Sequence, residues 1–272
     1  MICVIALSAV ILTAAIVGTY VILAGVNGEG RFSILGNGSS MNILAIGAES
    51  DDITRGAFIL MRLDVNEQRI LITALSPTIR ADVYARDDTL AGHMRYGGHI
   101  QAVAAVEYAL GIDVDRYAFI TRGGFESMID SLGGVAFNVP EGIHRQVEGA
   151  LPIVIDEGLQ TLTGAMTSTV FSYDDWAGAN AYRIQEELVA TTINQHVNAD
   201  NLGRASQLFR TFANTFRTDI SLMDKLAYLS FFDELAESRN NARIISLTGS
   251  MSGSYFVPHD ESLRELREAY SD

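Results

Sequence analysis

The sequence has little cysteine, lysine and proline, and each shortage excludes a class of protein. Cys3 is the only cysteine in 272 residues, so no disulfide framework can hold the fold together. Lys225 is the only lysine and the formal net charge is −14, which argues against nucleic acid as a partner because phosphate backbones need clustered cations. Only 4 residues are proline and 48% are hydrophobic, a composition typical of a folded α/β protein rather than a disordered one.

Several well-known catalytic motifs are missing as well. The sequence contains no Walker loop, no HExxH, no GxSxG and no Cys/His cluster, so nucleotide hydrolysis, zinc-dependent proteolysis and serine-hydrolase chemistry lack support. The five histidines are scattered, which is more typical of surface or capping groups than of metal ligands. There is no internal repeat and no coiled-coil heptad, so we expect one domain.

The first part of the chain is almost continuously apolar from Ile2 to Val26. About 20 such residues are enough to cross the hydrocarbon core of a bilayer as a helix. The run is too long for a cleaved signal peptide and lacks its basic start. We therefore predict a transmembrane anchor at residues 1–26, a Gly/Ser/Asn-rich linker at 27–41 and a folded domain at 42–272. Charge does not determine the orientation, since Arg31 after the run mildly favours the opposite sense to an external domain.

Strand and helix patterns alternate through the rest of the chain. Strands are predicted at Asn42–Gly47, Ala57–Val65, Arg69–Leu75 and Arg243–Leu247. Helices are predicted at His99–Leu110, Arg183–Val197, Leu202–Phe216, Leu222–Leu235 and Glu261–Tyr270, the first with Ile100, Val103, Ala104 and Val106 on its inner side. This mixture predicts a layered α-β-α domain with a mixed central sheet.

The stretch from Gly111 to Pro140 combines both patterns. A β-rich run from Val114 to Ile120 precedes a helix whose apolar residues Phe125, Met128, Ile129 and Leu132 recur at helical spacing. Gly133-Gly134 supplies the left-handed residue that ends a helix, and Val135 to Val139 returns to a sheet.

Charged residues near strand and helix ends are the candidates for chemistry. The arginines are Arg55, Arg80, Arg122 and Arg183, and the carboxylates are Glu49, Asp51, Asp52, Asp82 and the pair Asp174-Asp175. Arginines suit phosphate oxygens and carboxylates suit Mg²⁺, the two needs of phosphoryl transfer. A solvated acidic loop and ordinary surface arginines explain the same residues about equally well.

One stretch resembles a known family. The run GFESMIDSLGGVAFNVP, preceded by GIDVDRY, is similar to the central signature of LytR-CpsA-Psr (LCP) proteins. The resemblance implies a membrane-anchored, extracytoplasmic enzyme that transfers glycan polymers from a polyprenyl pyrophosphate carrier to peptidoglycan. The partners it implies are therefore polyprenyl-linked glycan, peptidoglycan and the membrane, without nucleic acid.

The resemblance also assigns roles to individual residues. It implies that Glu49 holds Mg²⁺, in the place of a family aspartate that is one methylene shorter. Arg55 and Arg183 correspond to phosphate-binding arginines. In the Ser76–Asp82 segment, Arg80 and Asp82 stand in for the arginine and aspartate that are central to activity, and Arg80 would also bind phosphate.

Other positions depart from the family pattern. Ser172 and Asp174 stand where the family has an Arg-x-Arg pair, Glu186 replaces a second helix arginine, and Gly56 or Ala57 replaces the second metal-binding aspartate. Each lost charge-assisted hydrogen bond to a pyrophosphate forgoes about 1.5–3 kcal/mol. Two hypotheses follow: a divergent, catalytically impaired Mg²⁺-dependent transferase, or a non-catalytic membrane-anchored protein that binds carrier lipid or serves as a scaffold.

Overall fold

The structure is a computed structural model that describes residues 40–48, 56–146, 152–173, 179–198, 201, 216–220, 224, 227–238 and 241–271. The predicted anchor lies outside these residues, as do Glu49, Arg55 and the predicted helix Leu202–Phe216 apart from its last residue. Within the described part of the chain, no helix combines the length and the apolar character needed to span a bilayer.

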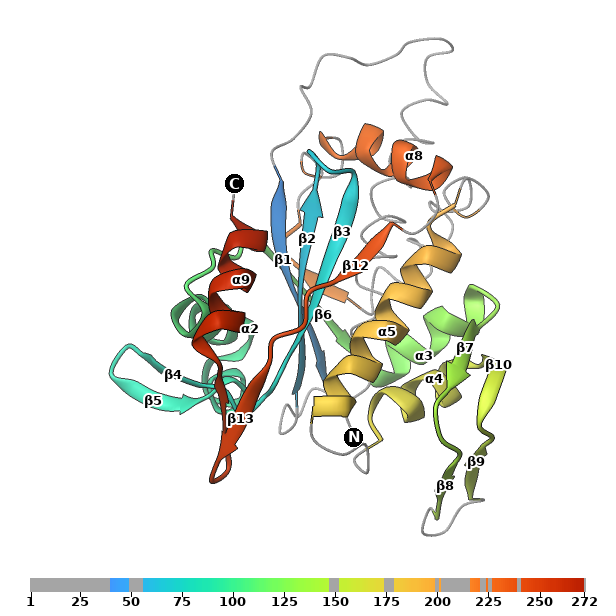
Figure 1. Ribbon diagram of the computed structural model, residues 1–272, viewed down its shortest axis with the longest axis horizontal. Coiled ribbons are helices and arrows are strands. Elements are labelled where there is room, and N and C mark those ends of the chain that lie inside the picture. Colours follow the sequence, from blue (N-terminus) through green and yellow to red (C-terminus); the bar gives the residue numbers. More distant parts are fainter. Residues whose placement is uncertain are drawn as a thin grey trace.

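A six-stranded sheet forms the centre of the molecule (Figure 1). Its order is β11 (Phe216–Thr218), β6 (Arg116–Thr121), β1 (Met41–Ala48), β2 (Gly56–Asp64), β3 (Arg69–Leu75) and β12 (Ala242–Ile244). β1 runs parallel to β6 and antiparallel to β2, so the sheet is mixed, as predicted. Every residue of β1 is buried, because helices cover both faces of the sheet.

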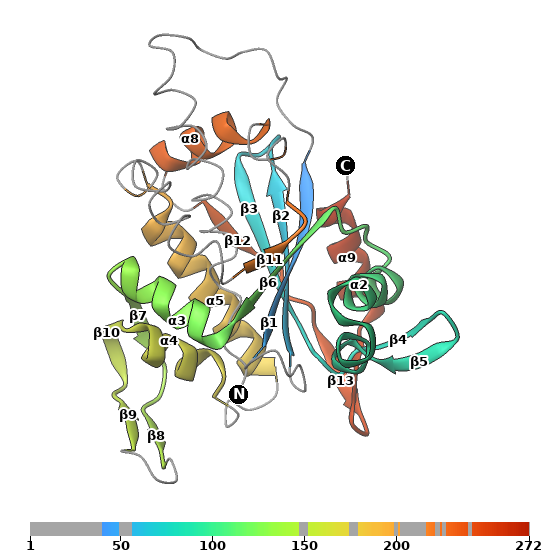
Figure 2. The same ribbon diagram turned by 180° about the vertical axis from the view of Figure 1, so that it is seen from behind.

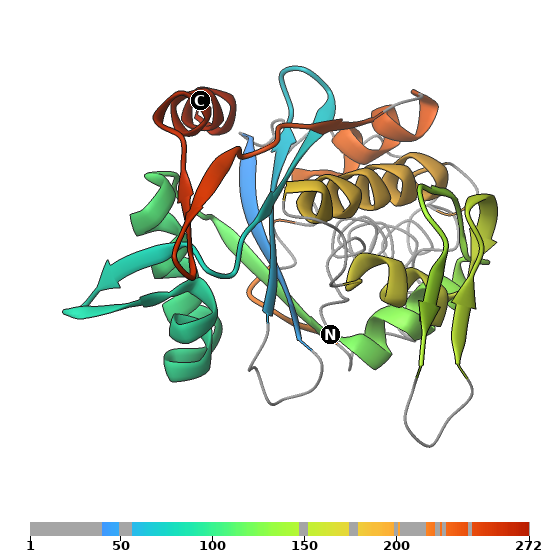
Figure 3. The same ribbon diagram turned by 60° about the horizontal axis from the view of Figure 1, so that its bottom comes forward.

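The side chains of β1 alternate between two separate cores. Ile43 and Ala45 pack into one core, whereas Leu44 and Ile46 pack into the other. The first core lies under α3 (Arg122–Ser131), α4 (Gly164–Phe171), α5 (Ala179–His196) and α8 (Leu229–Glu237), and the second under α2 (Leu90–Leu110) and α9 (Asp260–Tyr270). Figure 3 shows the helices on the two sides of the sheet, which confirms the predicted layering.

Small two-stranded units project from these layers (Figure 2). They are β4 (Arg80–Val83) with β5 (Arg86–Thr89), β7 (Val135–Val139) with β10 (Gly158–Leu162), β8 (Ile143–Arg145) with β9 (Ile153–Ile155), and β13 (Gly249–Ser252) with β14 (Tyr255–Pro258). Only β7 was predicted. The others have only three to five residues each, too few to leave a clear pattern in the sequence.

The stretch from Gly111 to Pro140 folds as predicted into β6, α3 and β7. Phe125, Met128 and Ile129 are buried on the inner face of α3. Gly133 and Gly134 end the helix with φ of 90° and 87°, the left-handed region that favours glycine. A Cβ on Gly134 would lie only 2.6 Å from the carbonyl oxygen of Leu162, so β10 can approach closely because this residue has no side chain.

Several predicted boundaries or faces are wrong. The predicted strand Arg243–Leu247 is β12, Ala242–Ile244, and Phe216, predicted as the end of a helix, begins β11. α2 begins at Leu90, not at His99, and its backbone breaks at Gly97 and Gly98. Ile100 was predicted on the inner side but is 72% exposed, because small residues such as Ala102 and Ala105 occupy the helix face against the sheet. α5 begins at Ala179, so Arg183 lies one turn inside the helix rather than at its start.

Candidate functional site

The ends of β1, β3 and β6 and the start of β2 lie together at one end of the central sheet, the lower end in Figure 1. Ala48 at the end of β1 pairs with Gly56 at the start of β2 and with Thr121 at the end of β6. Ser76 follows β3 at the same end, because Leu75 pairs with Phe58 near the start of β2. We call this end, together with the first turns of α3 and α5 and the last turn of α4, the site edge.

Ser76 joins the sheet to α5 at the site edge. The Tyr182 hydroxyl donates a hydrogen bond of 2.8 Å to Ser76 Oγ, which lies 2.9 Å from Thr78 Oγ1. Burial raises the pKa of Tyr182, so its hydroxyl stays protonated and remains a donor at neutral pH. The ring also meets Phe256 edge-on at 6.0 Å, which links this cluster to β14. Ser76, the first residue of the Ser76–Asp82 segment, is therefore held in place by contacts with Tyr182 and Thr78.

Glu186 faces the protein interior rather than an open site. Its residue is 1% exposed, and its carboxylate accepts hydrogen bonds from the Ala74 backbone N–H at 3.0 Å and from Ser246 Oγ. Burial raises the pKa of Glu186, although both hydrogen bonds act in the opposite direction. Glu186, which stands where the family has a second helix arginine, therefore holds α5 against β3.

The predicted phosphate-binding arginines lie on separate elements. Arg183 on α5 has a 55% exposed side chain and forms an ion pair with Glu187. Arg80 on β4 has a 48% exposed side chain and forms an ion pair with Asp87 on β5. Its guanidinium carbon Cζ lies 4.7 Å from the centre of the Tyr255 ring.

Asp82, the predicted partner of Arg80, is exposed on the same strand and lies opposite Asp87 in the β4–β5 register. Arg80 and Asp82 therefore share one hairpin, two residues apart. Each predicted arginine that the structure describes has a carboxylate of its own helix or hairpin as partner. The described contacts do not bring Arg80 and Arg183 together.

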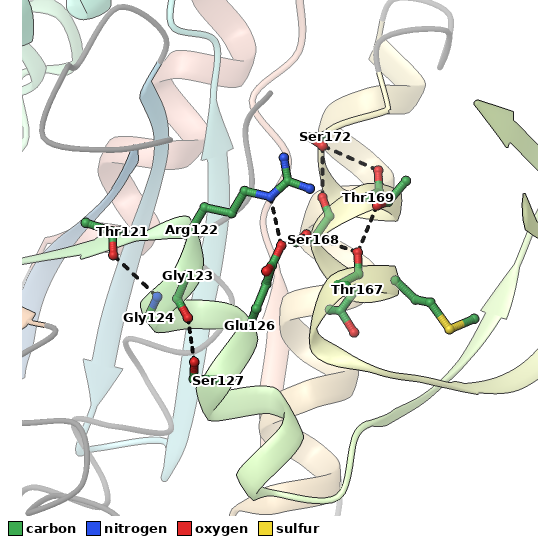
Figure 4. Close-up of polar contacts among 12 residues, drawn as sticks. Thr121, Arg122, Gly123, Gly124, Glu126, Ser127, Thr167, Ser168, Thr169 and Ser172 are labelled. Atoms are coloured by element: carbon green, nitrogen blue, oxygen red, sulfur yellow. Dashed lines mark hydrogen bonds and ion pairs between the residues drawn. The ribbon is translucent and has the colours of Figure 1, made fainter. Parts of the chain in front are cut away.

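A second polar cluster at the site edge connects α3 with α4 (Figure 4). Arg122 Nε donates to Glu126 Oε1 at 2.8 Å, and the buried Ser168 hydroxyl donates to the same oxygen at 2.5 Å. Ser172 is also buried, and its hydroxyl donates to the Ser168 carbonyl at 2.9 Å.

Sequence reasoning named Arg122 as a candidate but missed Glu126 and Ser168. The Arg-x-x-x-Glu spacing was a readable signal for the Arg122–Glu126 pair, because residues four apart meet on a helix. Nothing local indicated Ser168, which lies 42 residues away from Glu126 in the sequence.

Metal binding depends on residues outside the described part. Glu49, Arg55 and Asp174 all lie outside it, although Ala48 and Gly56, the chain neighbours of the first two, are a registered pair at the site edge. The residues that the structure describes contain no group of three His, Cys, Asp or Glu side chains able to hold a metal ion. Mg²⁺ at Glu49 thus stays a prediction.

The family model described as the LytR_cpsA_psr family matches residues 25–271. The chain belongs to this family. This LCP protein is 24% identical over 242 residues to a protein of Halalkalibacterium halodurans named polyisoprenyl-teichoic acid–peptidoglycan teichoic acid transferase TagU, a match that covers 85% of this chain and 78% of the relative.

Solved LCP structures show the same fold. Bacillus subtilis TagV matches with a TM-score of 0.73 at 18% identity, covering 85% of this chain and 96% of that one. The structure titled TagT bound to LIIa-WTA matches with a TM-score of 0.68 at 18% identity, covering 89% and 95%. At these identities the likeness establishes the fold alone, whereas the match of the family model confirms the LCP resemblance.

Proposed function

We propose that this LCP protein acts in the bacterial cell envelope on polyprenyl-linked glycan, transferring the polymer from its pyrophosphate carrier to peptidoglycan. The observation that carries the proposal is the family match over residues 25–271. The named activity of the TagU relative supports the same substrate class. The protein would be held in the membrane by residues 1–26, with the folded domain on the outer side.

The reaction we propose is a transfer of glycan phosphate. An acceptor hydroxyl of peptidoglycan would attack the phosphorus that carries the glycan, and the bond from that phosphorus to the lipid phosphate would break. Arg55, Arg80 and Arg183 would bind phosphate oxygens, with Asp82 beside Arg80 on its strand. Glu49 would hold Mg²⁺, whose contribution is to neutralise charge on the transferred group.

One set of contacts weakens the case for transfer, which leaves binding of the carrier, through its lipid part, as a second function. Arg80 and Arg183 are both largely exposed and both paired with a carboxylate, so their attraction for an anion is reduced by solvent and by the partner charge. Ser172 and Glu186, where the resemblance expects arginines, are buried and hydrogen-bonded within the protein. A protein of this kind would capture carrier lipid and position it for another enzyme.

One experiment separates the two functions. The full chain in detergent is incubated with a polyprenyl pyrophosphate glycan, Mg²⁺ and peptidoglycan, and both lipid binding and released lipid phosphate are measured. Release that falls in Arg183→Ala or Arg80→Ala supports transfer, whereas binding without release supports the carrier-binding function. Arg264→Ala is the matched control, because Arg264 pairs with Glu268 on α9, which covers the other face of the sheet. Absence of both binding and release would refute both functions.

A further inference from the structure

A chain of three hydroxyl groups runs from α5 to Thr78, next to the site edge. The Tyr182 hydroxyl donates to Ser76 Oγ at 2.8 Å, and the Thr78 backbone N–H donates to the same oxygen at 3.3 Å. These two donors occupy both acceptor positions of the Ser76 oxygen. Ser76 is 2% exposed, so its own proton needs a protein partner, and among the described residues that partner is Thr78 Oγ1 at 2.9 Å. The Ser76 hydroxyl therefore donates to Thr78.

This direction leaves the proton of the Thr78 hydroxyl available. Thr78 Oγ1 accepts from Ser76 and forms no other hydrogen bond within the described part of the chain. The residue is half-buried, so its side chain can be reached from solvent. The opposite direction would give Ser76 Oγ three donors for two acceptor positions and would leave its own buried proton unpaired. Thr78 is thus the member of the chain that can donate to a ligand.

The backbone on both sides of Thr78 is held by other elements, which gives its hydroxyl a defined position. The Thr78 carbonyl accepts from the Phe256 N–H of β14 at 3.3 Å. The carbonyls of Pro77 and Ile79 accept from the first two N–H groups of α2, at 3.0 and 2.9 Å. The β-branched side chain is itself stiff about χ1. A donor that is fixed before a ligand arrives loses less entropy on binding.

Thr78 lies between the elements that carry the predicted phosphate-binding arginines. Arg183 follows Tyr182 on α5, and Arg80 begins β4 two residues after Thr78. A hydroxyl that accepts one hydrogen bond is a stronger donor for the next, and such bonds are strongest toward a charged oxygen. Unlike Arg80 and Arg183, the Thr78 hydroxyl has no carboxylate partner in the part of the chain that the structure describes. A phosphate oxygen would therefore not have to displace a carboxylate from it.

We propose that the Thr78 hydroxyl donates a hydrogen bond to a phosphate oxygen of the polyprenyl pyrophosphate carrier, oriented through Ser76 by the hydroxyl of Tyr182. This inference rests on the proposed function and adds a substrate-binding residue to it. Thr78 contacts the ligand, whereas Ser76 and Tyr182 are positioning residues. No proton is transferred, because each hydroxyl keeps its own.

The test measures binding by the full chain in detergent. The probes are geranylgeranyl pyrophosphate, inorganic pyrophosphate, and geranylgeraniol, which has the lipid tail without phosphate. Thr78→Val keeps the shape of the side chain and should raise the Kd for geranylgeranyl pyrophosphate about 10- to 100-fold, the loss expected for a hydrogen bond to a charged oxygen. It should leave the Kd for geranylgeraniol unchanged. Thr78→Ser restores the hydroxyl and should bind the lipid pyrophosphate nearly as tightly as the wild type.

Tyr182→Phe tests the positioning role, because it keeps the ring against Phe256 and removes only the hydroxyl. Ser76 Oγ then has an acceptor position for the Thr78 proton, which can turn inward, so the Kd for geranylgeranyl pyrophosphate should rise by less than in Thr78→Val. The double variant should bind no more weakly than Thr78→Val alone, because Tyr182 acts through Thr78. Thr161→Val, which removes an exposed hydroxyl from β10, is the matched control and should change no Kd.

The outcomes distinguish this inference from the proposed function. If Thr78→Val binds the lipid pyrophosphate as tightly as the wild type does, the role of Thr78 is refuted while the proposed function survives. An equal loss with geranylgeraniol, or a loss confined to inorganic pyrophosphate, would refute the contact with the carrier phosphate. Additive losses in the double variant would refute the positioning role of Tyr182. If the wild type binds neither geranylgeranyl pyrophosphate nor a polyprenyl pyrophosphate glycan, the proposed function itself fails.

Discussion

Glu186 allows the sharpest test of the energetics at the site edge. Glu186→Leu keeps the volume of the side chain but removes both acceptors. Ala74 is 2% exposed, so water cannot replace the lost partner of its N–H, and an unsatisfied buried donor costs about 1–3 kcal/mol. Ser246 is exposed and can turn its hydroxyl to solvent. We therefore expect Glu186→Leu to have a free energy of unfolding about 1–3 kcal/mol below that of the equally uncharged Glu186→Gln, the cost of the single unpaired N–H.

Glu186→Gln should behave differently. The amide oxygen still accepts from Ala74, and the amide nitrogen can donate to Ser246 Oγ. The neutral side chain also avoids the cost of burying a charge, so the unfolding free energy at neutral pH should equal or exceed that of the wild type.

The pH dependence separates the cost of the unpaired Ala74 N–H from the cost of burying the Glu186 charge. Burial raises the pKa of Glu186 in the folded state above its ordinary value of 4.5, so the folded protein keeps this proton to higher pH than the unfolded chain does. Stability contributed by Glu186 is therefore present below pH 4.5 and is lost as pH rises through the raised folded pKa. Urea denaturation from acid to neutral pH should show that the free energy of unfolding of the Gln variant rises relative to that of the wild type across that window. Equal losses in the Gln and Leu variants, or a constant difference between Gln and wild type, would refute this reasoning.

Two further predictions concern the fold around the site. Gly134→Ala should lower the free energy of unfolding by about 2 kcal/mol or more, because its φ is positive and its Cβ would press on the Leu162 carbonyl. Gly133→Ala, where the Cβ meets no atom within 4 Å, should lower it by only about 1 kcal/mol. Thermal melts compare the two variants, and equal losses would show that the close approach does not matter. Arg62→Met should lower the free energy of unfolding by about 2–4 kcal/mol, because buried Arg62 donates to the Tyr270 carbonyl and anchors α9. Relative to the wild type, the variant should then show hydrogen exchange that is accelerated more in α9 than in α5. Unchanged exchange in α9 would contradict the anchoring role.

The sequence by itself determined the elements that depend on local pattern. The apolar run of β1, the helical spacing of α3 and the glycines at its end are all legible without coordinates, because each reflects the conformational preference of neighbouring residues. The same stretches carry the family signature. They were therefore sufficient to predict the layers, the mixed sheet and the LCP kinship.

Only the tertiary structure decided which partners the charged side chains have. The charge of Glu186 was legible, but its partner Ala74 is 112 residues away in sequence, and Ser168 is 42 residues from Glu126. The phase of α2 was misjudged for the same kind of reason, since the sheet selects the alanine face and leaves Ile100 exposed. Local sequence fixes where a side chain sits along its own element, whereas burial and pairing depend on what the rest of the chain packs against it.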